Sequence, residues 1–153
     1  MKTTKKGILV VLLHLCIFTA GAQNIPINEP DYNKSLLFAD LPDVFELKVT
    51  EFESLLLQVV GSGMNFRLAD NFLLKGSVVS KSDPADKRVR SVIVKSSNWP
   101  GAVLTFTKIF GEDGTYQYMG RILSRENSDA YDLTIISGRY YFKKKHFYDL
   151  LNE

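Results

Sequence analysis

The fold is most clearly indicated by Val103-Leu-Thr-Phe-Thr-Lys-Ile-Phe110, followed by Gly111-Glu-Asp-Gly114 and by Thr115-Tyr-Gln-Tyr-Met-Gly-Arg-Ile-Leu123. In the first arm Leu104 and Phe106 share one face and threonines share the other, and aromatic residues alternate in the same way along the second arm. A period of two is typical of half-buried strands. The glycines of the connecting segment tolerate positive φ, which lets the chain reverse. The sequence therefore predicts an antiparallel hairpin over residues 103–123.

Segments with the same alternation continue from residue 64 to residue 144, and short runs of turn-forming residues separate them. These runs cover residues 69–71, 82–86, 97–101, 125–128 and 137–138. Gly76 and Gly120 lie inside strand patterns, where glycine marks a bulge, a bend or a close backbone approach. We therefore expect an α+β fold, mainly β, in which an antiparallel meander of six to seven strands is curled and packed on one N-terminal helix.

The expected helix follows a short strand near the start of the domain. Residues 44–49 alternate and predict the first strand. Thr50-Glu51-Phe52-Glu53 fits a capping box, in which the Thr50 hydroxyl and the Glu53 carboxylate accept hydrogen bonds from the first backbone amides. The apolar residues that follow at helical spacing form one stripe: Phe52, Leu55, Leu56 and Val59. We expect this stripe to pack on the sheet and the helix to end at Gly61.

The first residues, 1–22, have the pattern of a secretory signal peptide. Lysines within residues 2–6 precede an apolar run over residues 8–18, and small residues occupy positions 20–22. We expect cleavage before Gln23 and a mature protein that is secreted or periplasmic. The apolar run is shorter than the roughly 20 residues needed to span a bilayer, so we expect no stable transmembrane span after cleavage.

The rest of the chain is expected to form one domain after a linker. Residues 23–43 contain three of the five prolines and predict an extended linker, in which the apolar residues 36–38 could dock on the domain. Residues 44–153 then form a single α+β domain, long enough to bury a core without disulfides. The one cysteine, Cys16, lies in the expected signal peptide, which excludes thiol catalysis and thiolate metal sites from the mature chain.

Charge and histidine content exclude further classes of function. The chain has 19 Lys and Arg against 17 Asp and Glu, and three of the lysines belong to the expected signal peptide, so the mature chain is close to neutral. It lacks the basic footprint of nucleic-acid binding, and we expect no nucleic-acid partner. His146 is the only histidine outside the signal peptide. A histidine-rich metal site is thereby excluded, and we expect no metal and no cofactor.

Candidate catalytic groups are few, and we assign none. His146 has an aspartate three residues after it, but no G-x-S-x-G nucleophile motif occurs in the sequence. The carboxylates of Asp129 with Asp132, and of Glu112 with Asp113, fall at turns or strand ends, where such residues commonly bond to the backbone. We therefore expect a non-enzymatic protein, with a carboxylate-dependent hydrolase as the second alternative.

The best candidate for a contact surface is the basic, aromatic segment Arg139-Tyr-Tyr-Phe-Lys-Lys-Lys145. A basic strand suits an acidic partner, lipid headgroups or glycans, whereas lysines on an edge strand also prevent pairing with other chains. Trp99, in the turn before the central hairpin, is either a second exposed aromatic residue or a cap on the open end of the core. The candidate contact residues are Arg139, Tyr141, Lys143, Lys144, Lys145 and Trp99.

These observations favour an exported, non-enzymatic domain that acts through surface contacts with a protein or a cell-envelope component. The first alternative is a carrier that binds a small apolar or glycan ligand in a cavity of the curled sheet. The in-strand glycines and the seven tyrosines motivate it. The large apolar residues of the strands instead favour an interior filled by the protein's own side chains.

Overall fold

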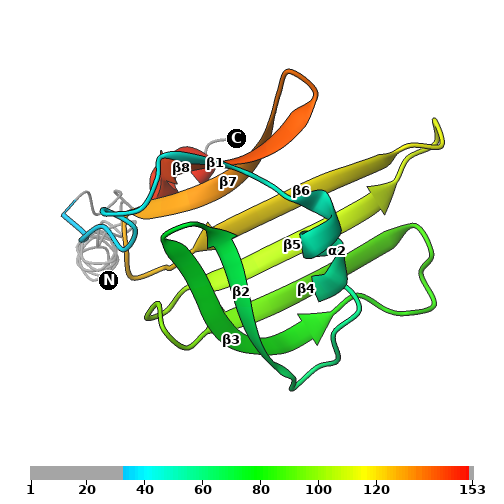
Figure 1. Ribbon diagram of the computed structural model, residues 1–153, viewed down its shortest axis with the longest axis horizontal. Helices are drawn as coiled ribbons and strands as arrows, with labels where there is room; N and C mark the ends of the chain where they lie inside the picture. Colours follow the sequence, from blue (N-terminus) through cyan, green and yellow to red (C-terminus); the bar gives the residue numbers. More distant parts are fainter. Residues whose placement is uncertain (1–32, 152–153) are drawn as a thin grey trace, which may run out of the picture. The chain divides into compact units, whose positions relative to one another are not determined.

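The computed structural model describes residues 33–151, which form one curled antiparallel sheet of eight strands, half of a barrel, with a short helix (Figure 1). Strands β2 to β8 follow one another as a meander, and β1 lies beside β8. The strands are β1 (Val44–Glu46), β2 (Gly63–Ala69), β3 (Phe72–Lys81), β4 (Val89–Ser96), β5 (Val103–Phe110), β6 (Tyr116–Leu123), β7 (Asp129–Ile136) and β8 (Arg139–His146). A short 3₁₀ helix, η1 (Phe147–Leu151), follows β8. The predicted mainly β, curled meander is confirmed.

The central hairpin forms as predicted. β5 and β6 pair along eight residues, with Phe106 opposite Gly120. The reversal uses Gly114, whose φ is 78°, and a hydrogen bond of 2.8 Å from the Gly111 amide to the Thr115 carbonyl. A left-handed φ is accessible to glycine at little cost. The local chemistry of the turn therefore sets the register of the two arms.

The two glycines inside strands mark close approaches. A Cβ on Gly120 would lie 3.0 Å from Cζ of the Phe142 ring, and a Cβ on Gly76 would lie 2.3 Å from the Lys95 carbonyl oxygen. No side chain fits at Gly76 unless the backbone of β4 moves. The close approaches expected at these positions are confirmed.

The helix begins two residues earlier than the predicted capping box implies. α2 spans Val49–Leu55, and Lys48 precedes it without a capping hydrogen bond from its side chain. Thr50 therefore lies inside the helix, and the predicted capping box is wrong. The Glu53 carboxylate is instead held by side chains of the central hairpin, described below.

The helix also ends earlier than predicted. Beyond Leu55 the chain turns, and the Gly61 amide donates a hydrogen bond of 2.8 Å to the Val78 carbonyl of β3. Because the sheet binds the backbone there, the helix cannot continue to Gly61. The predicted apolar stripe is correct for Phe52 and Leu55, which are buried, and wrong for Val59, which is exposed.

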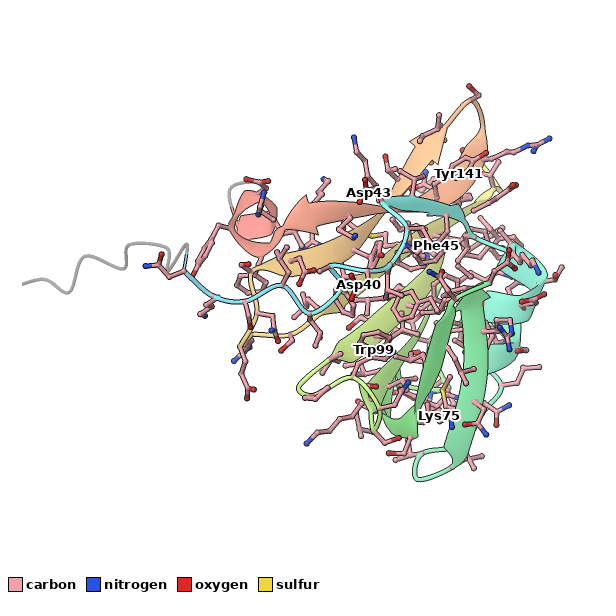
Figure 2. All side chains as sticks on the ribbon, turned by 60° about the vertical axis from the view of Figure 1, so that its left-hand side comes forward. Asp40, Asp43, Phe45, Lys75, Trp99 and Tyr141 are labelled. Atoms are coloured by element: carbon pink, nitrogen blue, oxygen red, sulfur yellow. The ribbon has the colours of Figure 1, made fainter. Side chains whose placement is uncertain are left out.

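Aromatic rings fill the concave face of the sheet. The Phe52 ring of α2 lies 5.2 Å from the Phe106 ring and 5.5 Å from the Phe142 ring, measured between centroids. Phe45, in the interior of the domain, lies 5.1 Å from Tyr131 (Figure 2). The largest side chains without solvent exposure are Tyr131, Phe38, Phe72, Phe106, Phe142, Leu74, Leu104 and Ile122. The curl therefore encloses a packed core.

Residues 33–43, here called the N-terminal segment, run along the sheet without helix or strand. The Phe38 side chain is 0% exposed, and its ring lies 5.3 Å from that of Tyr131. The backbone amides of Leu37 and Phe38 donate to the two carboxylate oxygens of Asp129, each at 2.7 Å. The apolar cluster at residues 36–38 thus docks through Phe38.

The expected signal peptide over residues 1–22 and the first part of the expected linker lie outside the described residues. Cleavage before Gln23 therefore stays a prediction. Within residues 33–151, no helix combines the length and the apolar character that crossing a bilayer requires.

Candidate functional site

The predicted contact strand, β8, lies inside the sheet, between β1 and β7. Its lysines therefore do not protect an edge, and the edge-protection interpretation is wrong. Arg139, Tyr141 and Lys143 alternate with the buried residue Phe142, so they belong to the convex face, and Tyr141 lies at the periphery in Figure 2. The Arg139 guanidinium lies 3.7 Å from the Glu46 carboxylate of β1.

The other two lysines of this strand are engaged within the domain. Lys144 Nζ donates to the Leu41 carbonyl at 2.7 Å and lies 3.2 Å from the Asp43 carboxylate. Lys145 Nζ lies 3.3 Å from the Asp132 carboxylate. Lys144 thus holds the N-terminal segment on the sheet. The structure separates the predicted contact residues into an outward-facing set and an internally bonded set.

Trp99 belongs to the end of the core. Its indole N–H donates to the Leu73 carbonyl at 3.0 Å, and its ring lies 5.5 Å from Phe72 and 5.8 Å from Phe38. The side chain is half-buried. Of the two roles expected for Trp99, this geometry is that of a cap on the core (Figure 2).

The carboxylates considered for catalysis bond to the protein itself. Asp129 is buried and accepts the two amides of the N-terminal segment. Asp132 lies 2.9 Å from Arg121 Nε. Asp113 accepts hydrogen bonds from the Thr115 amide and hydroxyl, which hold the pKa of its carboxyl below the usual value. These contacts serve turns and strand connections.

A polar cluster of three side chains joins the helix to the central hairpin. The Glu53 carboxylate accepts hydrogen bonds from Lys108 Nζ and, at 2.6 Å, from the Tyr118 hydroxyl. These hydrogen bonds hold the pKa of Glu53 below its usual value. Burial, followed by the neighbouring Glu53 carboxylate, raises the pKa of Tyr118 well above its usual value. Both pKa values move away from neutrality, whereas acid–base catalysis needs groups that titrate near the working pH. The cluster is suited to anchoring α2 on β5 and β6.

A group of exposed apolar side chains follows α2 in residues 57–60, here called the apolar loop. Leu57, Val59 and Val60 are 81%, 68% and 60% exposed. Full burial of one such side chain is worth roughly 1.5 to 3 kcal/mol, and folding of this chain gains little of it. A soluble domain rarely leaves such residues next to one another unless another surface covers them.

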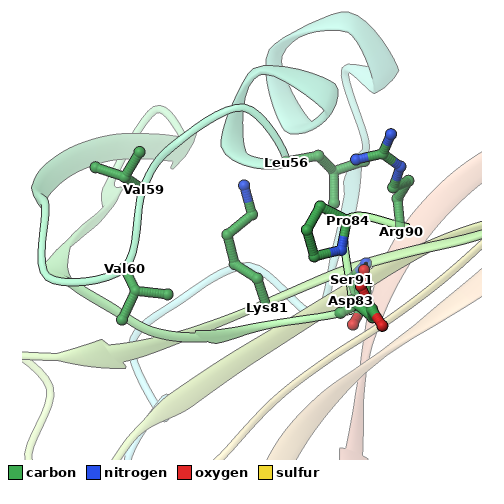
Figure 3. A pocket seen from close by; sticks show the side chains of 9 residues that line it. Leu56, Val59, Val60, Lys81, Asp83, Pro84, Arg90 and Ser91 are labelled. Atoms are coloured by element: carbon green, nitrogen blue, oxygen red, sulfur yellow. The ribbon is translucent and has the colours of Figure 1, made fainter. Parts of the chain in front are cut away.

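Two hollows adjoin the apolar loop. The first, of about 440 Å³, lies between the loop and the β3–β4 connection, and Val59, Val60, Lys81 and Pro84 line it (Figure 3). The second, of about 400 Å³, lies beside α2, and Leu57 lines it. Leu56 and Arg90 line both hollows. The two hollows therefore share two lining residues, and the exposed side chains of the apolar loop border both.

The prediction from sequence missed this surface, although a signal was present. Five of the six residues 55–60 are apolar, with Gln58 as the exception. One helical face holds apolar residues at every third or fourth position, so a continuous run exceeds what one face can bury. The excess marks residues that must either be exposed or be covered by a partner.

Within residues 33–151, no three His, Cys, Asp or Glu side chains gather as a metal site would require. Comparison of the chain with protein-family models, with curated proteins and with solved structures finds no match.

Proposed function

We propose that this chain is an exported, non-enzymatic binding domain that acts through surface contact with a partner protein of the cell envelope. The observation that carries the proposal is the apolar loop with its two hollows. Protein–protein contacts draw most of their affinity from a few apolar anchors that fill pockets and exclude water. The loop supplies such anchors, and the hollows accept anchors of the partner.

A protein partner suits the apolar loop better than a lipid surface. Lys81 and Arg90 line the first hollow together with Asp83, and Lys108 and Arg90 line the second together with Glu53. Both signs of charge thus border the apolar residues. Anionic leaflets attract clusters of one sign, namely lysine and arginine. Mixed charges around hollows favour the specific pairing found between proteins.

The carrier alternative has less support, because aromatic rings occupy the concave face that a ligand would need. The two hollows beside the apolar loop have other lining residues than the aromatic core, so neither lies on the concave face. Ligand burial in carriers and cofactor sites is usually extensive.

Photo-crosslinking followed by affinity measurement tests the proposal. The full chain, with p-benzoylphenylalanine at position 59, is exposed to the envelope fraction of its host, and the crosslinked protein is then purified for titration calorimetry. We expect Leu57→Ser and Val60→Ser each to weaken binding at least about tenfold, because both remove a central apolar anchor. The melting temperature should stay unchanged, since both side chains are exposed.

The control is Leu36, which is 51% exposed on the N-terminal segment. The same crosslinker at position 36 should not capture the partner, and Leu36→Ser should leave its affinity within about twofold. Equal capture at positions 36 and 59, or an affinity indifferent to Leu57→Ser and Val60→Ser, would contradict the proposal.

A further inference from the structure

The sheet opens into a fork between β6 and β7. These strands share only three residue pairs, from Leu123 opposite Ala130 to Arg121 opposite Asp132, whereas β7 and β8 share eight. Beyond the last pair, the β7–β8 hairpin turns away from β6 (Figure 1). We call residues 116–120 of β6 and residues 133–136 of β7 the open fork. Within residues 33–151, neither segment has a partner strand on the side that faces the fork.

Backbone hydrogen-bonding groups of β6 point toward the open fork, where no neighbouring strand of the described chain pairs with them. The Tyr118 amide points into the fork and donates to the Tyr140 hydroxyl at 3.3 Å. Because backbone groups alternate between the two sides of a strand, those of Tyr116 and Gly120 face the same way. A tyrosine hydroxyl therefore occupies one of the positions that a neighbouring strand would fill. Unpaired strand edges of this kind are templates for an added strand.

A hollow of about 510 Å³ lies where the strands part. The last paired residues, Arg121 and Asp132, line it together with the first residues beyond them, Gly120 and Leu133. Met119 and Leu123 of β6 and two threonines of β5 complete the lining. Since Arg121 Nε and the Asp132 carboxylate already bond to each other at 2.9 Å, the hollow favours an apolar side chain over a charged one.

We propose that the open fork binds an extended, apolar peptide segment of a partner protein, which adds as a strand along residues 116–120 and places one side chain in the hollow. Five residues of strand span about 16 Å, enough for several backbone hydrogen bonds. In this mode of recognition the backbone supplies affinity and a pocket supplies specificity. The site stands on different residues from the apolar loop and does not depend on the function proposed above.

The outer edges of the sheet are less suited to this task. β1 has three residues, and β2 carries a register shift between Arg67 and Ala69. Short strands and bulges are the devices that discourage edge pairing. The open fork has neither device, and it lies beside a hollow.

Peptide selection tests the inference. A phage-displayed library of random decapeptides is selected on the full chain, and enriched peptides are synthesised and titrated against two variants. Met119→Lys puts a charge into the hollow and should weaken binding at least tenfold. Gln117→Lys puts the same charge on the same face of β6, outside the lining of the hollow, and should change affinity less than twofold. Hydrogen exchange of amides in residues 116–120 should slow on binding.

Backbone chemistry supplies the second arm of this experiment. The enriched peptide is N-methylated at every second backbone amide, in two versions that together cover all amides and leave every side chain in place. Binding should be abolished in the version whose methylated amides face β6 and be kept in the other. The inference fails if no peptide is enriched, if enriched peptides bind both variants equally, or if N-methylation has no effect. It also fails if a second copy of the chain fills the fork. That outcome would be seen as a dimer that dissociates in the Met119→Lys variant but not when peptide is added.

Discussion

At the scale of single residues, contacts across the fold decide what each polar side chain does. Glu53 has the spacing of a capping residue, yet its carboxylate turns to Lys108 and Tyr118, far away in sequence. In this place the carboxylate gains an ion pair with Lys108 as well as hydrogen bonds, and the partly buried setting screens the charges less than open solvent would. The same sequence position therefore anchors a helix to a sheet instead of starting the helix.

This arrangement predicts pH-dependent stability. Glu53→Gln removes the charge and should lower the free energy of unfolding at pH 7 by about 1 kcal/mol, a value that allows for solvent screening. The pKa of Glu53 lies below its ordinary value of 4.5 in the folded protein, so the stabilisation is complete above that value and is lost as the pH falls through the folded pKa. Urea unfolding should show the two proteins converging at acidic pH.

Glu51→Gln is the matched control. Glu51 belongs to the same helix and pairs only at the surface with Lys48, at 3.4 Å. Its substitution should change stability little at any pH. If Glu53→Gln lowers the free energy of unfolding by the same amount at pH 7 and at acidic pH, the carboxylate charge is not what anchors α2.

At the scale of elements, neighbours along one strand have opposite roles. Lys143 is exposed, whereas the Lys144 side chain is 16% exposed and bonds to the Leu41 carbonyl and to Asp43. Alternation with the apolar Phe142 places Lys144 on the inner face and Lys143 on the outer face, but it does not show what Lys144 contacts there. The N-terminal segment supplies those contacts, the Leu41 carbonyl and the Asp43 carboxylate.

Lys144→Ser should therefore destabilise the domain, and Lys143→Ser should not. Loss of the Lys144 hydrogen bond and ion pair leaves the Leu41 carbonyl without its donor, which costs about 2 kcal/mol for a charged donor. Lys143→Ser should change the free energy of unfolding by less than about 0.5 kcal/mol, as for most surface sites. Urea unfolding of the two variants side by side measures the difference. Equal effects of the two variants would show that Lys144 does not hold the segment.

At the scale of the whole molecule, the core extends beyond the expected start of the domain at residue 44. Phe38 and Leu41 are both buried, and the Phe38 ring contacts Phe72, Trp99 and Tyr131. The N-terminal segment thus supplies one wall of the interior. Removal of buried side chains strongly destabilises a protein, because the surrounding structure relaxes only in part to fill the cavity.

A chain that starts at residue 44 should therefore melt far below one that starts at residue 31. Loss of the Phe38 side chain alone costs roughly 3 to 5 kcal/mol by the usual scale for buried phenylalanine. Thermal unfolding followed by circular dichroism compares the two chains, with Phe38→Ala in the longer chain as the intermediate case. Melting temperatures within a few degrees of each other would mean that residues 33–43 contribute little to the stability of the domain.

Features that depend on neighbours a few residues away could be predicted from the sequence. The hairpin over residues 103–123 follows from alternation and from Gly114, and the next turn follows from Gly138, whose φ of 78° is accessible to glycine at little cost. The composition of the strands likewise indicated a filled, curled interior. These are short-range preferences, and each is visible within a window of about ten residues.

Contacts between distant parts of the chain set where the helix ends, what Lys144 and Phe38 contact, and where apolar surface and strand edges stay uncovered. Asp129 receives the amide of Leu37 from 92 positions away, and Lys144 bonds to Leu41 from 103 positions away. No local pattern encodes such pairings. The apolar loop and the open fork arise in the same way, because a residue is exposed or unpaired only by virtue of what the distant parts of the chain leave uncovered.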